Sequence, residues 1–233
     1  MSAARARFLP TLGLALVVVA VCAGVFYFQQ PPAQPNSSRN GPDFRMVSDE
    51  QKIADAEQRI FASVPEKQAA YEMAFLELKS AGMVHSISLP TRESIHRREE
   101  LLKRFDDANT ALEAVFKNAE ETLRADLLHE GFSEYTSAKA AARFAQRSRI
   151  PLILKIRSCD RESNVALLQL LDLLDTRWGT WRSSDEGHLV FKTPADTNAY
   201  NAIRQQIATI GAAQQAAQAE AQQAAQPPAK PKP

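Results

Sequence analysis

Two short patterns in the sequence have the spacing of metal ligands. Glu93 precedes His96, and Asp126 precedes His129, at the three-residue step used in di-iron helical bundles. A shared metal needs two such pairs on different helices. Both pairs fall on one predicted helix, about 50 Å apart if that helix is straight. We therefore expect solvated histidines, and no metal or other cofactor.

Cys159 stands between Arg157 and Arg161, and nearby cations lower the pKa of a thiol. That setting suits a nucleophile or a redox group. The same cysteine also lies on an apolar stripe with Ile156 and Ala166, and free cysteines are among the most buried residues. We expect a packed cysteine, with an intermolecular disulfide and a catalytic thiol as the alternatives.

A run of basic residues between positions 139 and 161 is opposed only by Asp160. On helices this run predicts a basic face that meets anionic lipid headgroups or an acidic partner; the plainer interpretation is a solvated surface. The residues of this predicted basic face are Lys139, Arg143, Arg147, Arg157 and Arg161.

Trp178 and Trp181 flank Gly179, where a predicted helix gives way to a hairpin. We expect the two rings to close the end of a bundle, with stacking on a ligand as the alternative. The sequence contains no Gly-rich phosphate loop, no Gly-x-Ser-x-Gly elbow and no His-Glu-x-x-His motif. We therefore do not expect an enzyme.

The elements that must position these residues are mostly helices. Ser48 with Gln51, and Ser63 with Glu66, match capping boxes, and Pro65 separates the first helix from the second. A long third helix is predicted from Thr91 to Gly131. Its apolar positions recur at helical steps: Ile95, Leu102, Phe105, Leu112, Phe116, Ala119 and Leu123.

The remaining elements follow from position 137 onward. Residues 137–148 predict a helix, and 150–178 a further helix, although 152–156 also suits a short strand. Residues 180–192 predict a β-hairpin, and Thr193-Pro194 opens the last amphipathic helix. The fold class is therefore all-α: an elongated antiparallel bundle of about five helices, with a small β-hairpin near the C-terminal end.

The ends of the chain differ from this body, which spans 43–211. Residues 212–226 are almost all alanine and glutamine, and 227–233 are rich in proline and lysine. We expect 212–233 to be disordered, because alanine and glutamine supply no large apolar anchor; extension of the last helix through 212–226 is the alternative. The body contains only Cys159, which excludes an intramolecular disulfide. The balance of 28 basic and 27 acidic residues argues against a nucleic-acid-binding protein.

Residues 8–28 contain no charge and, as a helix, would be roughly 31 Å long, enough to cross a bilayer. Arg5 and Arg7 precede this stretch, which predicts a cytoplasmic N-terminus at 1–7 and an exported body. A Pro-rich linker follows at 29–42. We expect an uncleaved single-pass anchor in a bacterial inner membrane, with a periplasmic body. A cleaved leader and acylation of Cys22 are the alternatives.

At the end of the body, the run from Gly187 to Pro194 is followed by Ala199-Tyr200-Asn201 and a terminal helix. In this layout the chain resembles the YiaF-like family of uncharacterised Gram-negative envelope proteins. The resemblance implies an envelope location and a helical domain, and it brings no catalytic residues. The predicted function is an envelope interaction or scaffold protein that binds an envelope protein or self-associates. The alternative is a periplasmic sensor or carrier with a small ligand between its helices.

Overall fold

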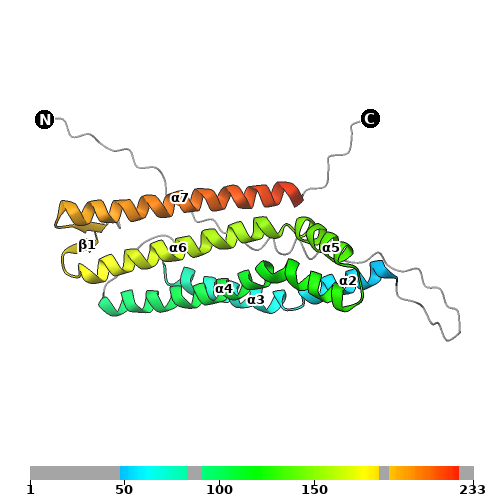
Figure 1. Cartoon of the computed structure of the whole chain (residues 1–233). Coiled ribbons are helices and arrows are strands. Elements are labelled where there is room, and N and C mark those ends of the chain that lie inside the picture. Colours follow the sequence, from blue (N-terminus) through cyan, green and yellow to red (C-terminus); the bar gives the residue numbers. More distant parts are fainter. Residues whose placement is uncertain (1–47, 83–90, 184–188, 226–233) are drawn as a thin grey trace, which may run out of the picture.

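The computed structural model describes residues 48–82, 91–183 and 189–225, and six helices and one two-stranded sheet lie in these ranges. The helices run side by side along an elongated bundle (Figure 1). The fold class predicted from the sequence, a helical bundle with a small hairpin, is confirmed. The predicted anchor at 8–28 lies outside the described residues. Within them, no helix combines the length and apolarity that a membrane span requires.

The first two helices are short and meet at a break. Helix α2 (Asp49–Ile60) begins at Ser48, whose hydroxyl accepts a hydrogen bond from the Gln51 amide, as its sequence predicts. Helix α3 (Val64–Ser80) follows at once, with a proline in its first turn. The capping box predicted at Ser63 is wrong, because Ser63 itself has helical dihedrals and its side chain makes no capping bond.

Helix α4 (Arg92–His129) is the spine of the bundle, and its 38 residues make it about 57 Å long. Thr91 and Ser94 form a reciprocal capping box at its start. At its end Gly131 adopts a φ of 92°, which lets the Phe132 amide bond back to the Leu127 carbonyl. The long predicted helix is therefore confirmed, together with its two ends.

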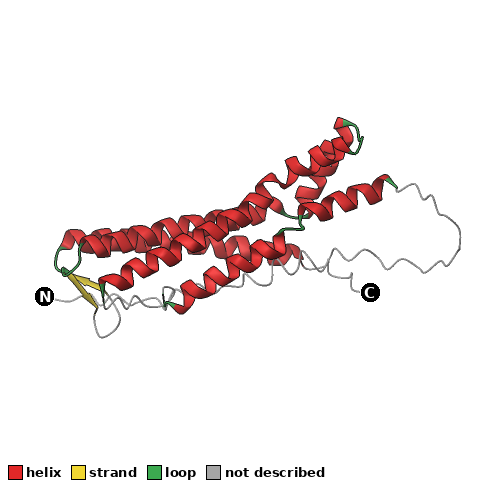
Figure 2. Ribbon diagram, turned by 90° about the horizontal axis from the view of Figure 1, so that it is seen from below, coloured by secondary structure: helices red, strands yellow, loops and turns green. Residues whose placement is uncertain are grey.

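Helix α5 (Glu134–Arg147) is short and leads into α6 (Ile150–Thr176), which runs back along α4. Proline occupies the first turn of α6, where its missing amide costs nothing. Residues 152–156 are therefore helical, and the strand alternative is wrong. The hairpin follows, with β1 (Trp181–Ser183) antiparallel to β2 (Leu189–Phe191) and Arg182 opposite Val190. The two strands lie at one end of the bundle (Figure 2).

Helix α7 (Pro194–Ala225) is longer than the sequence predicts. Residues 212–225 continue the helix, so the predicted disorder of this part of the tail is wrong. Ala217 and Ala221 pack against Ile156 on α6, which shows that alanine can hold a helix whose neighbour supplies the large side chain. Residues 226–233 lie outside the described ranges.

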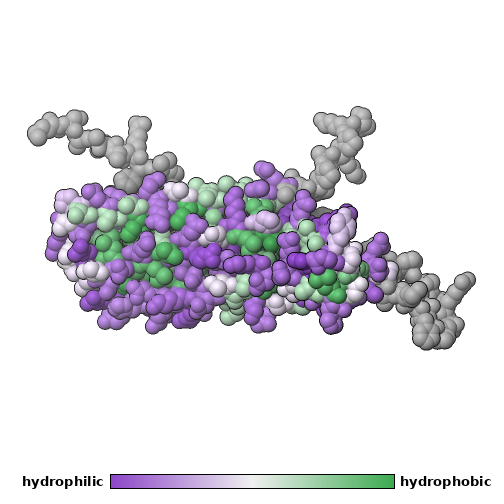
Figure 3. All heavy atoms as spheres, viewed as in Figure 1, coloured by the Kyte–Doolittle hydropathy of each residue, from purple (hydrophilic) through white to green (hydrophobic). Residues whose placement is uncertain are grey.

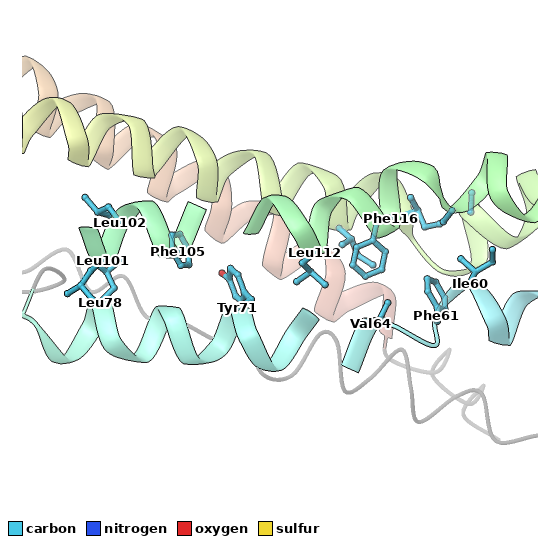
Figure 4. Close-up of a cluster of buried hydrophobic side chains, with 14 of the residues drawn as sticks. Ile60, Phe61, Val64, Tyr71, Leu78, Leu101, Leu102, Phe105, Leu112 and Phe116 are labelled. Carbon is cyan, nitrogen blue, oxygen red and sulfur yellow. The ribbon is translucent and has the colours of Figure 1, made fainter. Parts of the chain in front are cut away.

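The main core consists of large side chains that face one another across α3, α4 and α6. Figure 4 shows Val64, Tyr71 and Leu78 pointing from α3 towards Phe105 and Leu112 on α4. Aromatic rings add further contacts: the ring centroids of Phe61, at the end of α2, and of Phe144, on α5, are 5.1 Å apart. Helix α6 contributes Leu170, Leu171 and Leu174 to the same core, which fixes it in place, and α6 in turn positions the residues described below.

Candidate functional site

A group of buried polar side chains lies where α3, α4, α6 and α7 meet. We call it the central polar cluster, and it consists of Tyr71, Asn109, Arg157, Asp160 and Gln214. Arg157 is only 3% exposed and Asp160 only 6%. Charged groups at such depth are rare and need partners, so the contacts of the cluster decide what it can do.

An ion pair forms the centre of this cluster. Arg157 and Asp160 are one turn apart on α6, and Arg157 Nη2 lies 3.2 Å from Asp160 Oδ2. The guanidinium also stacks on the ring of Tyr71, with its Cζ 4.2 Å from the ring centroid. The Tyr71 hydroxyl donates to Asp160 Oδ2 at 3.0 Å. Tyr71, on α3, therefore contacts both members of the ion pair on α6.

Two further helices contribute amide side chains. Gln214 Nε2, on α7, donates to Asp160 Oδ1 at 2.5 Å. Asn109 Nδ2, on α4, donates to the backbone carbonyl of Arg157 at 3.1 Å. Each oxygen of Asp160 thus accepts from a different helix, and the carboxylate joins α3, α6 and α7 at one point.

The electrostatics of the cluster follow from its burial. Burial raises the pKa of Asp160, and the Arg157 charge and the hydrogen bonds from Tyr71 and Gln214 oppose that rise. Burial also raises the pKa of Tyr71, so the phenol keeps its proton and remains a donor at neutral pH. The cluster is therefore a fixed set of donors around one carboxylate.

Three oxygens in or next to the cluster accept no hydrogen bond from the described residues. They are Oδ1 of Asp106, Asn109 and Asn164. Asp106 lies one turn before Asn109 on α4, and Asn164 lies one turn after Asp160 on α6. Burial, and then the neighbouring charge of Asp107, raise the pKa of Asp106. Buried acceptors of this kind suit a water molecule or a small ligand that carries hydrogen-bond donors.

The structure forms only part of the basic face that the sequence predicts. Arg157 is a buried member of the central polar cluster, so its inclusion in a surface face is wrong. It is buried because it shares the inward side of α6 with Ile153 and Asp160. Arg161 is exposed and pairs with Glu113 on α4 at 3.0 Å.

The other three residues of that predicted face lie on α5. Lys139, Arg143 and Arg147 are exposed. Arg147 pairs with Glu57 on α2, and the Lys139 ammonium lies 5.5 Å from the centroid of the Tyr135 ring. Acidic residues that are distant in sequence therefore pair with Arg147 and Arg161. The exposed basic surface that remains is a short stretch of α5 with Lys139 and Arg143.

The two tryptophans meet at the hairpin end of the bundle. Their rings are edge to face at 86°, with centroids 5.4 Å apart. Trp181 is half-buried against the core, and its Nε1 donates to the Leu174 carbonyl at 2.8 Å. Trp178 stays exposed. These contacts favour the structural role over the ligand-stacking alternative.

Of the described residues, His96, His129 and Cys159 occupy ordinary surroundings. His96 is exposed, 3.3 Å from Glu99, and the described residues contain no group of three metal-ligating side chains. Cys159 is buried with Ala166 and Ile210. Burial, and then the charge of Glu162, raise the pKa of the Cys159 thiol, which opposes the lowering expected from nearby arginines. The packed cysteine predicted from the sequence is therefore confirmed.

Sequence reasoning missed most of the central polar cluster. A signal was present, because Asn109 falls in phase with Leu102, Phe105, Leu112 and Phe116 along α4. Asp160 and Asn164 share the inward side of α6 in the same way. A polar residue in phase with an apolar stripe therefore marks a buried polar contact.

Comparison with family models, curated proteins and solved structures gives no match for this chain. The resemblance to the YiaF-like family stays a prediction. The side chains described above are therefore the basis on which a function can be inferred.

Proposed function

We propose that the chain is a bacterial envelope protein, anchored in the inner membrane by residues 8–28, whose periplasmic body binds a helical partner protein. A binding role accords with the positions of His96 and His129 at opposite ends of α4 and with the burial of Cys159 in the bundle. The observation that carries the proposal is a short apolar stripe on the exposed side of α3.

Helix α3 has two apolar sides. The inward side carries Val64, Tyr71 and Leu78, which are buried. On the outward side Met73 is 65% exposed and Leu76 is 59% exposed, and Ala69, one turn earlier, is exposed as well. Steps of four and three residues place these three side chains in one stripe. We call it the outer α3 stripe.

A stripe of this form suits a partner helix. Residues at such steps are the anchors by which two helices pack together, and the small Ala69 allows a close approach. Figure 3 shows one face of the molecule, on which polar residues separate smaller apolar areas. Single exposed apolar residues are common on any surface, but a stripe aligned along one helix is typical of a contact between helices.

The test is site-specific photo-cross-linking in cells that express the full chain. A photoreactive amino acid at Met73 or Leu76 should give a discrete adduct with one envelope protein, or with a second copy. The same amino acid at Asn118, an exposed polar position on α4, is the matched control. Leu76→Asp should abolish the adduct formed from position 73. Equal adducts from positions 73 and 118, or none from either, would contradict the proposal.

The anchor needs its own measurement. Alkaline carbonate should leave the full chain in the membrane pellet, and a reporter fused to its C-terminus should be active in the periplasm. Release by carbonate would contradict the anchor without affecting the cross-linking result.

A second candidate function is a carrier or sensor of a small polar ligand. It is favoured by the buried acceptor oxygens of Asp106, Asn109 and Asn164. Native mass spectrometry of the purified full chain should then show a bound small molecule, which is lost in Asn164→Leu. A mass that matches the bare polypeptide would contradict this candidate.

A further inference from the structure

The second half of α7 is attached differently from the first half. We call residues 210–225 the α7 distal segment. In the first half, Tyr200, Ile203 and Ile207 pack against the main core, and the Tyr200 ring lies 5.3 Å from that of Phe191. The distal segment instead contacts two small clusters that are separate from the main core.

Those two clusters contain few large side chains. One consists of Ile156, Ala217 and Ala221, with Leu152 at its margin. The other consists of Cys159, Ala166 and Ile210, with Ile207 of the first half at its margin. Each buried methylene contributes about 0.8 kcal/mol, so an alanine methyl contributes far less than a leucine or phenylalanine side chain. The apolar attachment of the distal segment is therefore weak.

Polar contacts supplement this attachment. Gln214 donates to Asp160, and Arg149 Nη1 donates to the Ala221 carbonyl at 3.2 Å. Lys155 Nζ lies 3.8 Å from Glu220 Oε2, but both side chains are exposed, and exposed ion pairs contribute little to stability. The Gln214 contact is buried, and it connects the segment to the central polar cluster.

Gly211 is the second residue of the α7 distal segment, next to its junction with the first half. A Cβ added there would meet no atom within 4 Å, so packing does not require a glycine. Glycine lowers the stability of a helix by about 1 kcal/mol relative to alanine. The helix is therefore weakest where its attachment changes.

We propose that the α7 distal segment separates from α6 as a unit while the rest of the bundle stays folded. Separation uncovers Leu152, Ile156 and Cys159 together with the carboxylate of Asp160. The open form presents an apolar strip with a charge at its edge, which the closed form hides. A partner that binds only this strip would shift the population towards the open form. This inference is independent of the outer α3 stripe.

Cys159 is a native reporter of the separation, because it is buried in one cluster with Ile210 of the distal segment. Its exposure reports the separation whether or not the segment stays helical. The experiment alkylates the purified full chain in increasing urea and quantifies the Cys159 peptide by mass spectrometry, which separates it from Cys22. Global unfolding is followed by far-UV circular dichroism. Alkylation should proceed at urea concentrations below the global transition, with a weaker urea dependence than global unfolding.

A pair of variants sharpens this measurement. Ala217→Glu places a carboxylate against Ile156, at a position that is 0% exposed, and glutamate preserves helix propensity. It should raise the rate of Cys159 alkylation about tenfold or more, the change expected for a loss of about 1.4 kcal/mol. Ala219→Glu, at an exposed position of the same segment, should leave the rate unchanged.

Two results would overturn the proposal. One is alkylation of the wild-type chain that follows global unfolding, with the same midpoint and slope. The other is a folded Ala217→Glu chain whose alkylation rate equals that of Ala219→Glu. Should Ala217→Glu fail to fold, the urea series on the wild-type chain still decides.

Discussion

The two sides of α6 make an instructive comparison. In the main core, which it shares with α4, α6 contributes large leucine side chains, Leu170, Leu171 and Leu174, which are fully or almost fully buried. Towards the distal half of α7, it meets alanine and glutamine. Both interfaces are helical, and both join helices that lie side by side along the bundle (Figure 1). They differ in the size of the side chains between the helices.

This difference shows that helix content and attachment are separate properties. Alanine is the best helix former, so residues 212–225 form a regular helix. It contributes little buried area, and the same residues are therefore held weakly. The central polar cluster lies between the two interfaces, and Asp160 receives hydrogen bonds from α3 and from α7. The predictions below test this comparison.

The largest effect should come from Asp160→Ala. It leaves the buried guanidinium of Arg157 without its carboxylate, and removing one member of a buried ion pair costs about 3–5 kcal/mol. Urea unfolding followed by circular dichroism measures the loss. The double variant Arg157→Met with Asp160→Leu should recover most of the stability, and equal losses in the single and double variants would contradict a role for the pair.

Leu112→Ala tests the α4 side of the comparison. Leu112 is fully buried, and such a truncation costs about 2–5 kcal/mol. Global stability should fall, while alkylation of Cys159 at low urea should keep its wild-type rate, because that reaction depends on the α7 distal segment. Faster alkylation at low urea would show that the two interfaces are one cooperative unit.

Gly211→Ala tests the α7 side with a smaller change. It should stabilise α7 by about 0.5–1 kcal/mol, since the added methyl group meets open space. Alkylation of Cys159 should become slower, by a few-fold at most, and the midpoint of global unfolding should hardly move. An unchanged alkylation rate would indicate that the helix does not weaken at this position.

Asp106→Asn should have the smallest effect, and one that depends on pH. The pKa of Asp106 is raised in the folded chain, so its ionisation opposes folding. Its contribution to stability is complete below the pKa of the unfolded chain and is lost as the pH rises through the folded pKa. Asparagine does not ionise, so the variant does not lose this stability as the pH rises. The variant should therefore be slightly more stable than wild type at pH 7, and the gain should vanish at pH 3.

The sequence predicts much of this fold because local signals determine it. Ser48 and Thr91 cap helices with their own hydroxyls, and Gly131 ends α4 through its positive φ. The apolar stripe of α4 repeats at helical steps over its whole length. These features depend only on neighbouring residues, and short segments suffice to detect them.

The central polar cluster depends on contacts between residues that are distant in sequence. Tyr71, Asp160 and Gln214 meet only after α3, α6 and α7 have packed together. The basic run failed as a predictor for the same reason, since Glu57 and Glu113 neutralise it from other helices. The docking of 212–225 was missed because the large side chain of that contact, Ile156, belongs to the partner helix.

The position of the tryptophans has a practical consequence for spectroscopy. The chain contains two tryptophans, and both lie at the hairpin end, with their rings in contact. Intrinsic tryptophan emission excited at 295 nm therefore reports events at that end alone. A ligand that changes the emission acts near the hairpin, whereas one that binds elsewhere on the bundle leaves the spectrum unchanged.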